Sequence, residues 1–249
     1  MNNRGILLIG HGTRNAVGTE QFFELQQHLT KLVAPAPVAA GLLEFQSPTI
    51  PEAWNQLMAD GVTHIHVAPL LLFAAGHAKQ DIPNILAECQ ANHSNITFDQ
   101  SRPLSRHAAI IDLAMQRLSN TLASCQHPPD RTAVVMVGRG SHDPCAKADM
   151  RILSEIVTRR SSVADVITSF YAMTEPRLPD TLEQIAMSGR FDAVVVQPHL
   201  LFEGSLNQAI LNQANDAANR HPSVQWLTSG YLGPDPLLAE AIAKRTGIR

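Results

Sequence analysis

The stretch ILLIGHGT, residues 6–13, is written a second time in this chain as VVMVGRGS, residues 134–141. In both copies four apolar residues lead into a glycine, a basic residue (His11 or Arg139), a second glycine and a hydroxyl residue. A short apolar run that ends at glycines is typical of a buried parallel strand that leads into a helix. The two copies therefore predict two strands with the same place in two similar folds.

Two further stretches repeat in the same order. VAPLLLF (67–73) returns as VQPHLLF (196–202), and LLEFQSPTIPEAWNQL (42–57) returns as FYAMTEPRLPDTLEQI (170–185). Residues 11 and 139 differ by 128 positions, residues 48 and 176 by 128, and residues 69 and 198 by 129. Three ordered matches at a nearly constant offset predict an internal duplication.

Each half alternates apolar, strand-like runs with segments of helical periodicity. Strands are predicted at residues 6–10, 38–44, 63–69 and 96–99, and again at 132–137, 163–170, 193–198 and 224–229. Helices are predicted in the first half at residues 20–32, 50–59, 78–91 and 107–122. Repeated β-α order predicts an α/β protein with two similar doubly wound parallel-sheet domains. The proline-containing stretch SCQHPPDRT places a linker at 124–131, between domains at 1–123 and 132–249.

The bulk composition narrows the class of protein. The chain has 249 residues, is 45% hydrophobic and carries a formal charge of −3, which argues against nucleic acid as a partner. Its three cysteines form no CxxC pair and no even-numbered framework, as expected in a reducing compartment. The apolar runs, including the first, are too short for a signal peptide or a membrane span. We therefore expect a soluble cytoplasmic protein with no membrane partner.

Three polar residues lie at the ends of the first three predicted strands: His11 follows the first, Glu44 ends the second and His77 follows the third. The carboxyl ends of parallel strands meet at one edge of a sheet, where such folds bind ligands. Two imidazoles and a carboxylate suit a divalent ion such as cobalt, nickel or iron. They also suit proton removal near neutral pH. We therefore predict that these three residues are both the metal ligands and the catalytic groups.

The second half of the chain carries different residues at these three places: Arg139 for His11, Ala172 for Glu44 and Leu206 for His77. The apolar frame persists, since Pro69 is matched by Pro198 and Phe73 by Phe202. The duplicate scaffold therefore does not need the three residues, and a shared function explains why they are absent together. His142 and His199 fall at other positions and are interpreted as structural or as wall residues.

Other functions fit parts of the pattern. The glycine-rich GHGTRN could hold an anion on backbone N–H groups, although Asn15 stands where a dinucleotide fingerprint has its third glycine. A phosphotransfer enzyme would use His11 as nucleophile and would need several arginines, of which only Arg14 is close in sequence. A non-catalytic metal or tetrapyrrole carrier would use the same three ligands without turnover.

The stretches LLIGHGTRN, LLEFQSPTIPEAW and VAPLLLFAAGHAKQDIP resemble the signatures of the class II chelatases, and more narrowly those of the sirohydrochlorin chelatases of siroheme and cobalamin biosynthesis. The resemblance covers essentially the whole chain, as the long form with two tandem domains. It implies a lyase-class enzyme that inserts Fe2+ or Co2+, with Ni2+ a further candidate, into a tetrapyrrole bound in a cleft between the domains. It also implies that His11, Glu44 and His77 bind the metal and accept the pyrrole protons.

The same resemblance sets expectations for cofactor and substrate. With the three residues in one half only, one active site per chain is expected, in a monomer whose domains are related by a pseudo-twofold. The chain has no His-rich stretch and no CxxC, so neither an iron–sulfur cluster nor another prosthetic group is expected. Sirohydrochlorin carries many carboxylates, which basic side chains near the site would bind. The candidates by position are Arg14, Lys79, Arg102 and Arg139.

Overall fold

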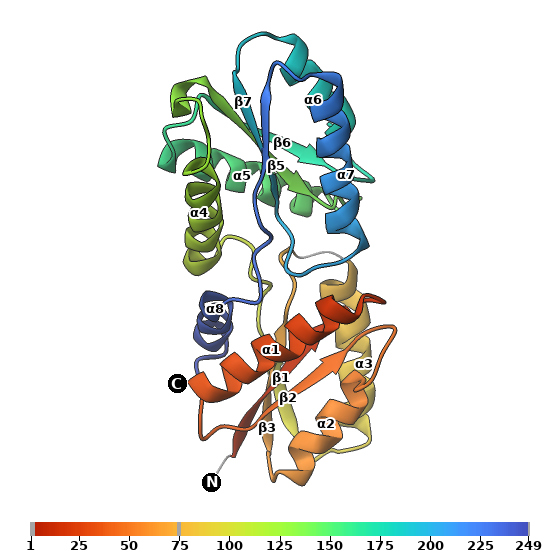
Figure 1. The fold of residues 1–249 in the computed structure, drawn as a ribbon. Helices are drawn as coiled ribbons and strands as arrows, with labels where there is room; N and C mark the ends of the chain where they lie inside the picture. The colour runs from red at the N-terminus through yellow and green to blue at the C-terminus, as the bar shows by residue number, and fades with distance from the viewer. Residues whose placement is uncertain (1–2, 74–75, 249) are drawn as a thin grey trace. The chain divides into compact units, whose positions relative to one another are not determined.

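The computed structural model describes residues 3–73 and 76–248, with the side chains of His77 and Ala78 outside the description. Its strands form two separate four-stranded sheets, and every strand pair within them is parallel. The chain divides into two compact units, one formed by Met1–Ile110 with Gly233–Arg249 and the other by Ile111–Leu232. The predicted fold class, a duplicated α/β protein with parallel sheets, is confirmed (Figure 1).

The first unit contains a sheet in the order β2-β1-β3-β4. Its strands are β1 (Arg4–Gly10), β2 (Val38–Leu42), β3 (His64–Pro69) and β4 (Thr97–Gln100). Its helices are α1 (Ala16–Leu32), α2 (Ile50–Ala59), α3 (Ile82–Ala91) and α8 (Pro236–Thr246), with a π-helix, η1 (His77–Asp81), directly before α3. Because β1 lies between β2 and β3, the loops that follow these three strands meet at one edge of the sheet.

Both faces of this sheet are covered. Leu7 and Val67 pack with Trp54 of α2 in one apolar cluster that also includes residues of α3. Strand residues of the opposite parity, such as Ile6 and Leu8, are buried on the other face, where α8 packs against α1 and β3. Burial on two faces explains why the strands are uninterrupted apolar runs.

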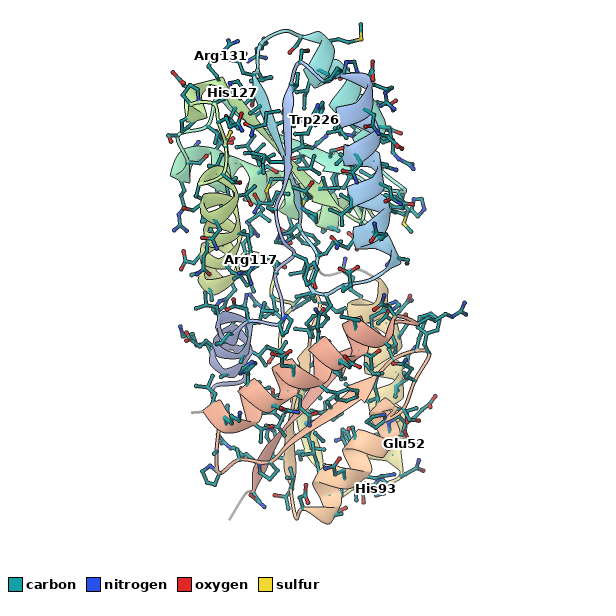
Figure 2. The ribbon with its side chains drawn as sticks, viewed as in Figure 1. Glu52, His93, Arg117, His127, Arg131 and Trp226 are labelled. Atoms are coloured by element: carbon teal, nitrogen blue, oxygen red, sulfur yellow. The ribbon has the colours of Figure 1, made fainter. Side chains whose placement is uncertain are left out.

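Helix starts in this unit follow from local side-chain chemistry. The Asn15 side chain accepts a hydrogen bond from the Gly18 N–H at 2.9 Å and caps α1. At α2, the backbone N–H of Thr49 donates to Glu52 (2.6 Å), while the Glu52 N–H donates to the Thr49 hydroxyl (Figure 2). The backbone hydrogen bond from Thr49 lowers the pKa of the Glu52 carboxyl.

The second unit repeats the plan with a sheet in the order β6-β5-β7-β8. Its strands are β5 (Thr132–Gly138), β6 (Asp165–Phe170), β7 (Ala193–Pro198) and β8 (Gln225–Thr228). Its helices are α4 (Ala108–Leu122), α5 (Pro144–Arg160), α6 (Leu178–Met187) and α7 (Ser205–Arg220), with a short 3-10 helix, η2 (Pro129–Arg131), before β5. The core between the sheet and α6 and α7 matches the core over α2 and α3.

The compact units differ from the predicted division at 1–123, 124–131 and 132–249. The last helix of each half packs in the unit of the other half: most of α4 belongs to the second unit and α8 to the first. The Gln197 side chain of β7 donates to the Ala114 carbonyl of α4 at 2.8 Å, and Arg117 of α4 donates to the Leu232 carbonyl at 3.0 Å (Figure 2). In the first unit, α8 takes the corresponding place beside α1. Duplicated sheets offer similar surfaces, so helical periodicity alone does not say which sheet a helix covers.

Among the helices of the described residues, none combines the length and apolar character that crossing a lipid bilayer requires.

Candidate functional site

His11 and Glu44 lie side by side at the carboxyl edge of the first unit's sheet. The loop after β2 continues the pairing with β1, because the Leu43 N–H donates to the Gly10 carbonyl (2.9 Å) and the Glu44 N–H donates to the His11 carbonyl (3.0 Å). His11 is half-buried and Glu44 is exposed. Two of the three predicted ligands are therefore neighbours through the backbone, although 33 positions separate them in the chain.

Gly12 allows this close approach. Its φ is +90°, and a Cβ at this position would lie 2.0 Å from the Glu44 carbonyl oxygen. Only glycine adopts such a backbone conformation readily and leaves room for the neighbouring chain. The second glycine of the motif therefore sets the distance between the β1 and β2 loops, which carry His11 and Glu44.

Phe45 adds an apolar, exposed ring to the same edge. Its φ is +72°, rare for a bulky residue, and its side chain is 52% exposed. The Phe45 ring centroid lies 6.2 Å from that of His11 and 5.0 Å from the Arg14 guanidinium carbon. The loop is tied to α1 by a 2.6 Å hydrogen bond from the Thr19 hydroxyl to Gln46. Strained residues with exposed apolar side chains concentrate at binding sites.

The tautomer of His11 follows from its own loop. Its Nδ1 lies 3.1 Å from the Gly12 carbonyl oxygen. A carbonyl oxygen only accepts, so this contact favours the proton on Nδ1 and leaves the lone pair of the neutral ring on Nε2. A metal ion or a proton would be taken up at Nε2.

The third predicted ligand, His77, begins η1, and its side chain lies outside the described residues. The chain after β3 leaves the sheet at the same edge, because the Leu70 N–H donates to the Ile9 carbonyl at 2.8 Å. The wide turn of η1 has a local cause in Pro83, which has no N–H to donate four residues back and whose ring would clash there. Single π turns of this kind are frequent at functional sites.

The predicted substrate-binding residues of this unit are exposed. Arg14 precedes α1 and contacts Phe45, while Lys79 lies in η1. Arg102 follows β4, where the Ser101 N–H donates to the Val67 carbonyl at 2.8 Å. All three therefore follow the carboxyl ends of strands in the first sheet.

The second unit reproduces the same loop geometry with different side chains. Its Ala172 N–H donates to the Arg139 carbonyl at 2.9 Å, as the Glu44 N–H does to His11. Gly140 has a φ of +91°, and its Cβ would lie 1.7 Å from the Ala172 carbonyl oxygen. The pairing of Arg139 with His11 and of Ala172 with Glu44 is confirmed, and this scaffold forms without an acid or a histidine at these places.

The histidines of the second unit differ in environment. His142 is exposed. His199 is 2% exposed and stands where Leu70 stands in the first unit, since the His199 N–H donates to the Val137 carbonyl as Leu70 does to Ile9. Burial lowers the pKa of His199 to about 4.

Sequence reasoning missed two features. One is Phe45, whose exposure and positive φ have no signature in the sequence. The other is a cluster of His64, His66 and Asp99, whose ligand atoms lie within 4.8 Å of one another. The spacing of the two histidines by two residues on a strand could have indicated a shared face. The partner carboxylate comes from another strand and gives no local signal.

The chain is thus a duplicated parallel α/β protein with an imidazole and a carboxylate at the carboxyl edge of one unit's sheet. A family model described as CbiX matches residues 5–121 and again residues 133–247. The chain belongs to the CbiX family.

Known proteins match over nearly the whole chain. The sirohydrochlorin cobaltochelatase of Priestia megaterium is 27% identical over 243 residues, which cover 97% of this chain and 78% of that protein. A sirohydrochlorin ferrochelatase of the same organism is 27% identical over 238 residues, 96% of this chain and 87% of that protein. The structure of SirB from Bacillus subtilis with Fe3+ matches with a TM-score of 0.87 at 25% identity, over 98% of this chain and 94% of that one.

Proposed function

We propose that this protein is a sirohydrochlorin chelatase, a lyase that inserts Fe2+ or Co2+ into the tetrapyrrole sirohydrochlorin. The observation that carries the proposal is the backbone pairing that holds His11 beside Glu44. The relatives named as sirohydrochlorin chelatases support it, because they match nearly the whole length of this chain. The divalent ion is a substrate of the reaction. Both iron and cobalt are named among the relatives, and the ligand set accepts either ion as well as Ni2+.

Insertion needs two operations that the edge residues are suited to perform. The ion must be held while it loses water, which His11 Nε2, the Glu44 carboxylate and the His77 imidazole would do. Two pyrrole N–H groups must also lose their protons as the ring takes up the ion, and the imidazoles of His11 and His77 and the carboxylate of Glu44 are groups that can accept a proton. Exposed Glu44 can pass a proton to water directly.

Recognition of the ring would combine charge and apolar contact. Arg14, Lys79 and Arg102 would bind substrate carboxylates at the first unit's edge, and Arg139 would do so at the equivalent edge of the second unit. The exposed Phe45 ring offers the flat macrocycle an apolar surface beside His11. A monomeric state, a cytoplasmic location and the cleft implied for the tetrapyrrole remain part of the proposal.

A continuous absorbance assay tests the activity. Purified protein is mixed with sirohydrochlorin and Co2+ or Fe2+ without oxygen, and the change of the ring spectrum is followed. We expect a rate well above that of metal and ring alone, and loss of most of that rate in His77→Ala with a melting temperature close to that of the unchanged protein. A rate equal to the background would favour the non-catalytic carrier instead.

A further inference from the structure

A second group of metal-ligand side chains lies at the other end of the first unit's sheet. His64 and His66 are two residues apart on β3 and so project from the same face. Asp99 is the direct partner of His66 on the neighbouring strand β4. The Asp99 carboxylate lies 2.9 Å from His64 Nε2 and 2.9 Å from His66 Nδ1. One carboxylate thus faces two imidazole nitrogens.

These separations are those of neighbouring ligands around one ion. For ligand bonds of about 2.1 Å, two ligands at a right angle lie about 3.0 Å apart. The three ligand atoms all lie within 4.8 Å of one another, so small side-chain rotations would bring them around a common centre. Two imidazoles and one carboxylate suit borderline divalent ions such as Co2+, Ni2+ and Zn2+.

The surroundings support His64 as a ligand. Its Nδ1 lies 2.7 Å from the Thr97 hydroxyl, a hydrogen bond that directs Nε2 toward Asp99. Metal-bound histidines usually make such a bond through the second ring nitrogen, which fixes the tautomer. His66 is 8% exposed, and its Nε2 has no hydrogen-bond partner among the described residues. Because the Asp99 carboxylate only accepts, Nδ1 of the neutral His66 ring carries the proton in this structure, and a bound ion would take the place of that proton.

The duplicate unit forms the same strands without these side chains. The strand registers place Ala193 where His64 stands, and Val195 where His66 stands. Leu227 of β8 corresponds to Asp99 of β4. The scaffold therefore does not require a polar cluster here, and the three side chains occur together in one unit only. Packing needs alone do not explain two histidines and an aspartate at these positions of the sheet.

We propose that His64, His66 and Asp99 form a second metal site that takes one borderline divalent ion. The cluster lies at the first residues of β3, and the His77 loop follows its last residue. At about 3.3 Å per residue, the five steps from the first to the last of its six residues cover roughly 16 Å. An ion at the cluster would link edge strand β4 to β3. Its effect would be on the stability of this unit, and it would not take part in metal insertion.

The experiment first removes the three proposed ligands of the chelatase site. In a His11→Ala, Glu44→Ala, His77→Ala background, equilibrium dialysis against Co2+ with metal analysis should find one ion per chain. The visible absorption of the bound Co2+ reports its ligands. The melting temperature of this background should rise with Co2+, because an ion that binds only the folded state stabilises it.

The variants of the cluster use residues that the duplicate already carries. Adding His64→Ala and His66→Val should weaken Co2+ binding by at least about 100-fold and abolish the melting shift, with the metal-free melting temperature nearly unchanged. Thr97→Val should weaken it by about 10- to 100-fold through the loss of the supporting hydrogen bond.

His93→Asn serves as the matched control. His93 is a half-buried histidine of the same unit, outside the cluster, with Nδ1 3.0 Å from the Cys89 carbonyl (Figure 2). This change should leave Co2+ binding as it was.

Two results would overturn the proposal. One is the absence of Co2+ binding in the triple variant that lacks His11, Glu44 and His77. The other is unchanged Co2+ binding after His64→Ala and His66→Val. In that case the cluster would be only a hydrogen-bonded group in which Asp99 bridges two imidazoles. Metal insertion by the otherwise unchanged protein is measured separately and should survive the loss of His64 and His66. The chelatase proposal and the second-site proposal can therefore fail independently.

Discussion

Replacing Gly12 by alanine tests whether the spacing of His11 and Glu44 determines turnover. The new Cβ would lie 2.0 Å from the Glu44 carbonyl oxygen, and real Cβ atoms stay at least 3.0 Å from such a neighbour. The Glu44 loop must therefore move by about 1 Å. The change adds a methyl group and leaves every proposed ligand in place.

The size of the effect follows from two costs. An alanine held at a φ of +90° costs roughly 1–2 kcal/mol, by analogy with the left-handed helical region. Loss of the hydrogen bond from Glu44 to His11 costs about 1 kcal/mol more. A total of about 2–3 kcal/mol lowers the melting temperature by roughly 4–12 °C in a chain of this size. Displacement of a reacting group by about 1 Å can slow turnover by about 100-fold.

Gly140→Ala is the matched control, because its Cβ would meet the Ala172 carbonyl oxygen at 1.7 Å in the unit that has no acid at this place. We expect a similar loss of melting temperature in both variants. In the sirohydrochlorin absorbance assay at saturating substrate, Gly12→Ala should lose most of its kcat and Gly140→Ala should keep it within a few-fold. Equal loss of kcat in the two variants, or full kcat in Gly12→Ala, would show that the spacing of His11 and Glu44 does not determine turnover.

Two other changes give separate tests. Phe45→Ala should raise KM for sirohydrochlorin about 2- to 5-fold, because it removes the exposed cation–π contact that holds the Arg14 guanidinium at this edge. Met173→Ala at the matching position should leave KM unchanged. Equal KM values for Phe45→Ala and the unchanged protein in steady-state assays would remove Phe45 from ring binding. His199 has a folded pKa of about 4, below the unfolded value of about 6.5, so the unfolded chain binds the extra proton and stability falls as pH drops through this window. In urea unfolding, the free energy of unfolding should be about 2 kcal/mol lower at pH 5.0 than at pH 7.5. The variant His199→Leu, which places the residue type of Leu70 at this position, should not show this decrease. The same decrease in the variant would mean that other groups cause it.

Much of the fold was predictable from short-range pattern. Apolar runs in regular alternation with helical segments indicated parallel strands, because such strands are buried on both faces. The constant offset between repeats indicated the duplication. The order of strands placed His11 and Glu44 at one edge, because the carboxyl ends of neighbouring parallel strands meet. The backbone hydrogen bond between these two residues bears out that step.

The duplicated parallel architecture and the edge that carries His11 and Glu44 follow from the amino-acid pattern alone, because hydrophobic periodicity and the order of strands can be read along the chain. Which sheet α4 and α8 cover is known only from the folded chain, since two similar sheets offer a helix similar surfaces. The tertiary structure alone brought Gly12 against the Glu44 carbonyl and Asp99 against His64 and His66. Those contacts depend on the register between strands far apart in sequence, and register is fixed by packing across the whole unit.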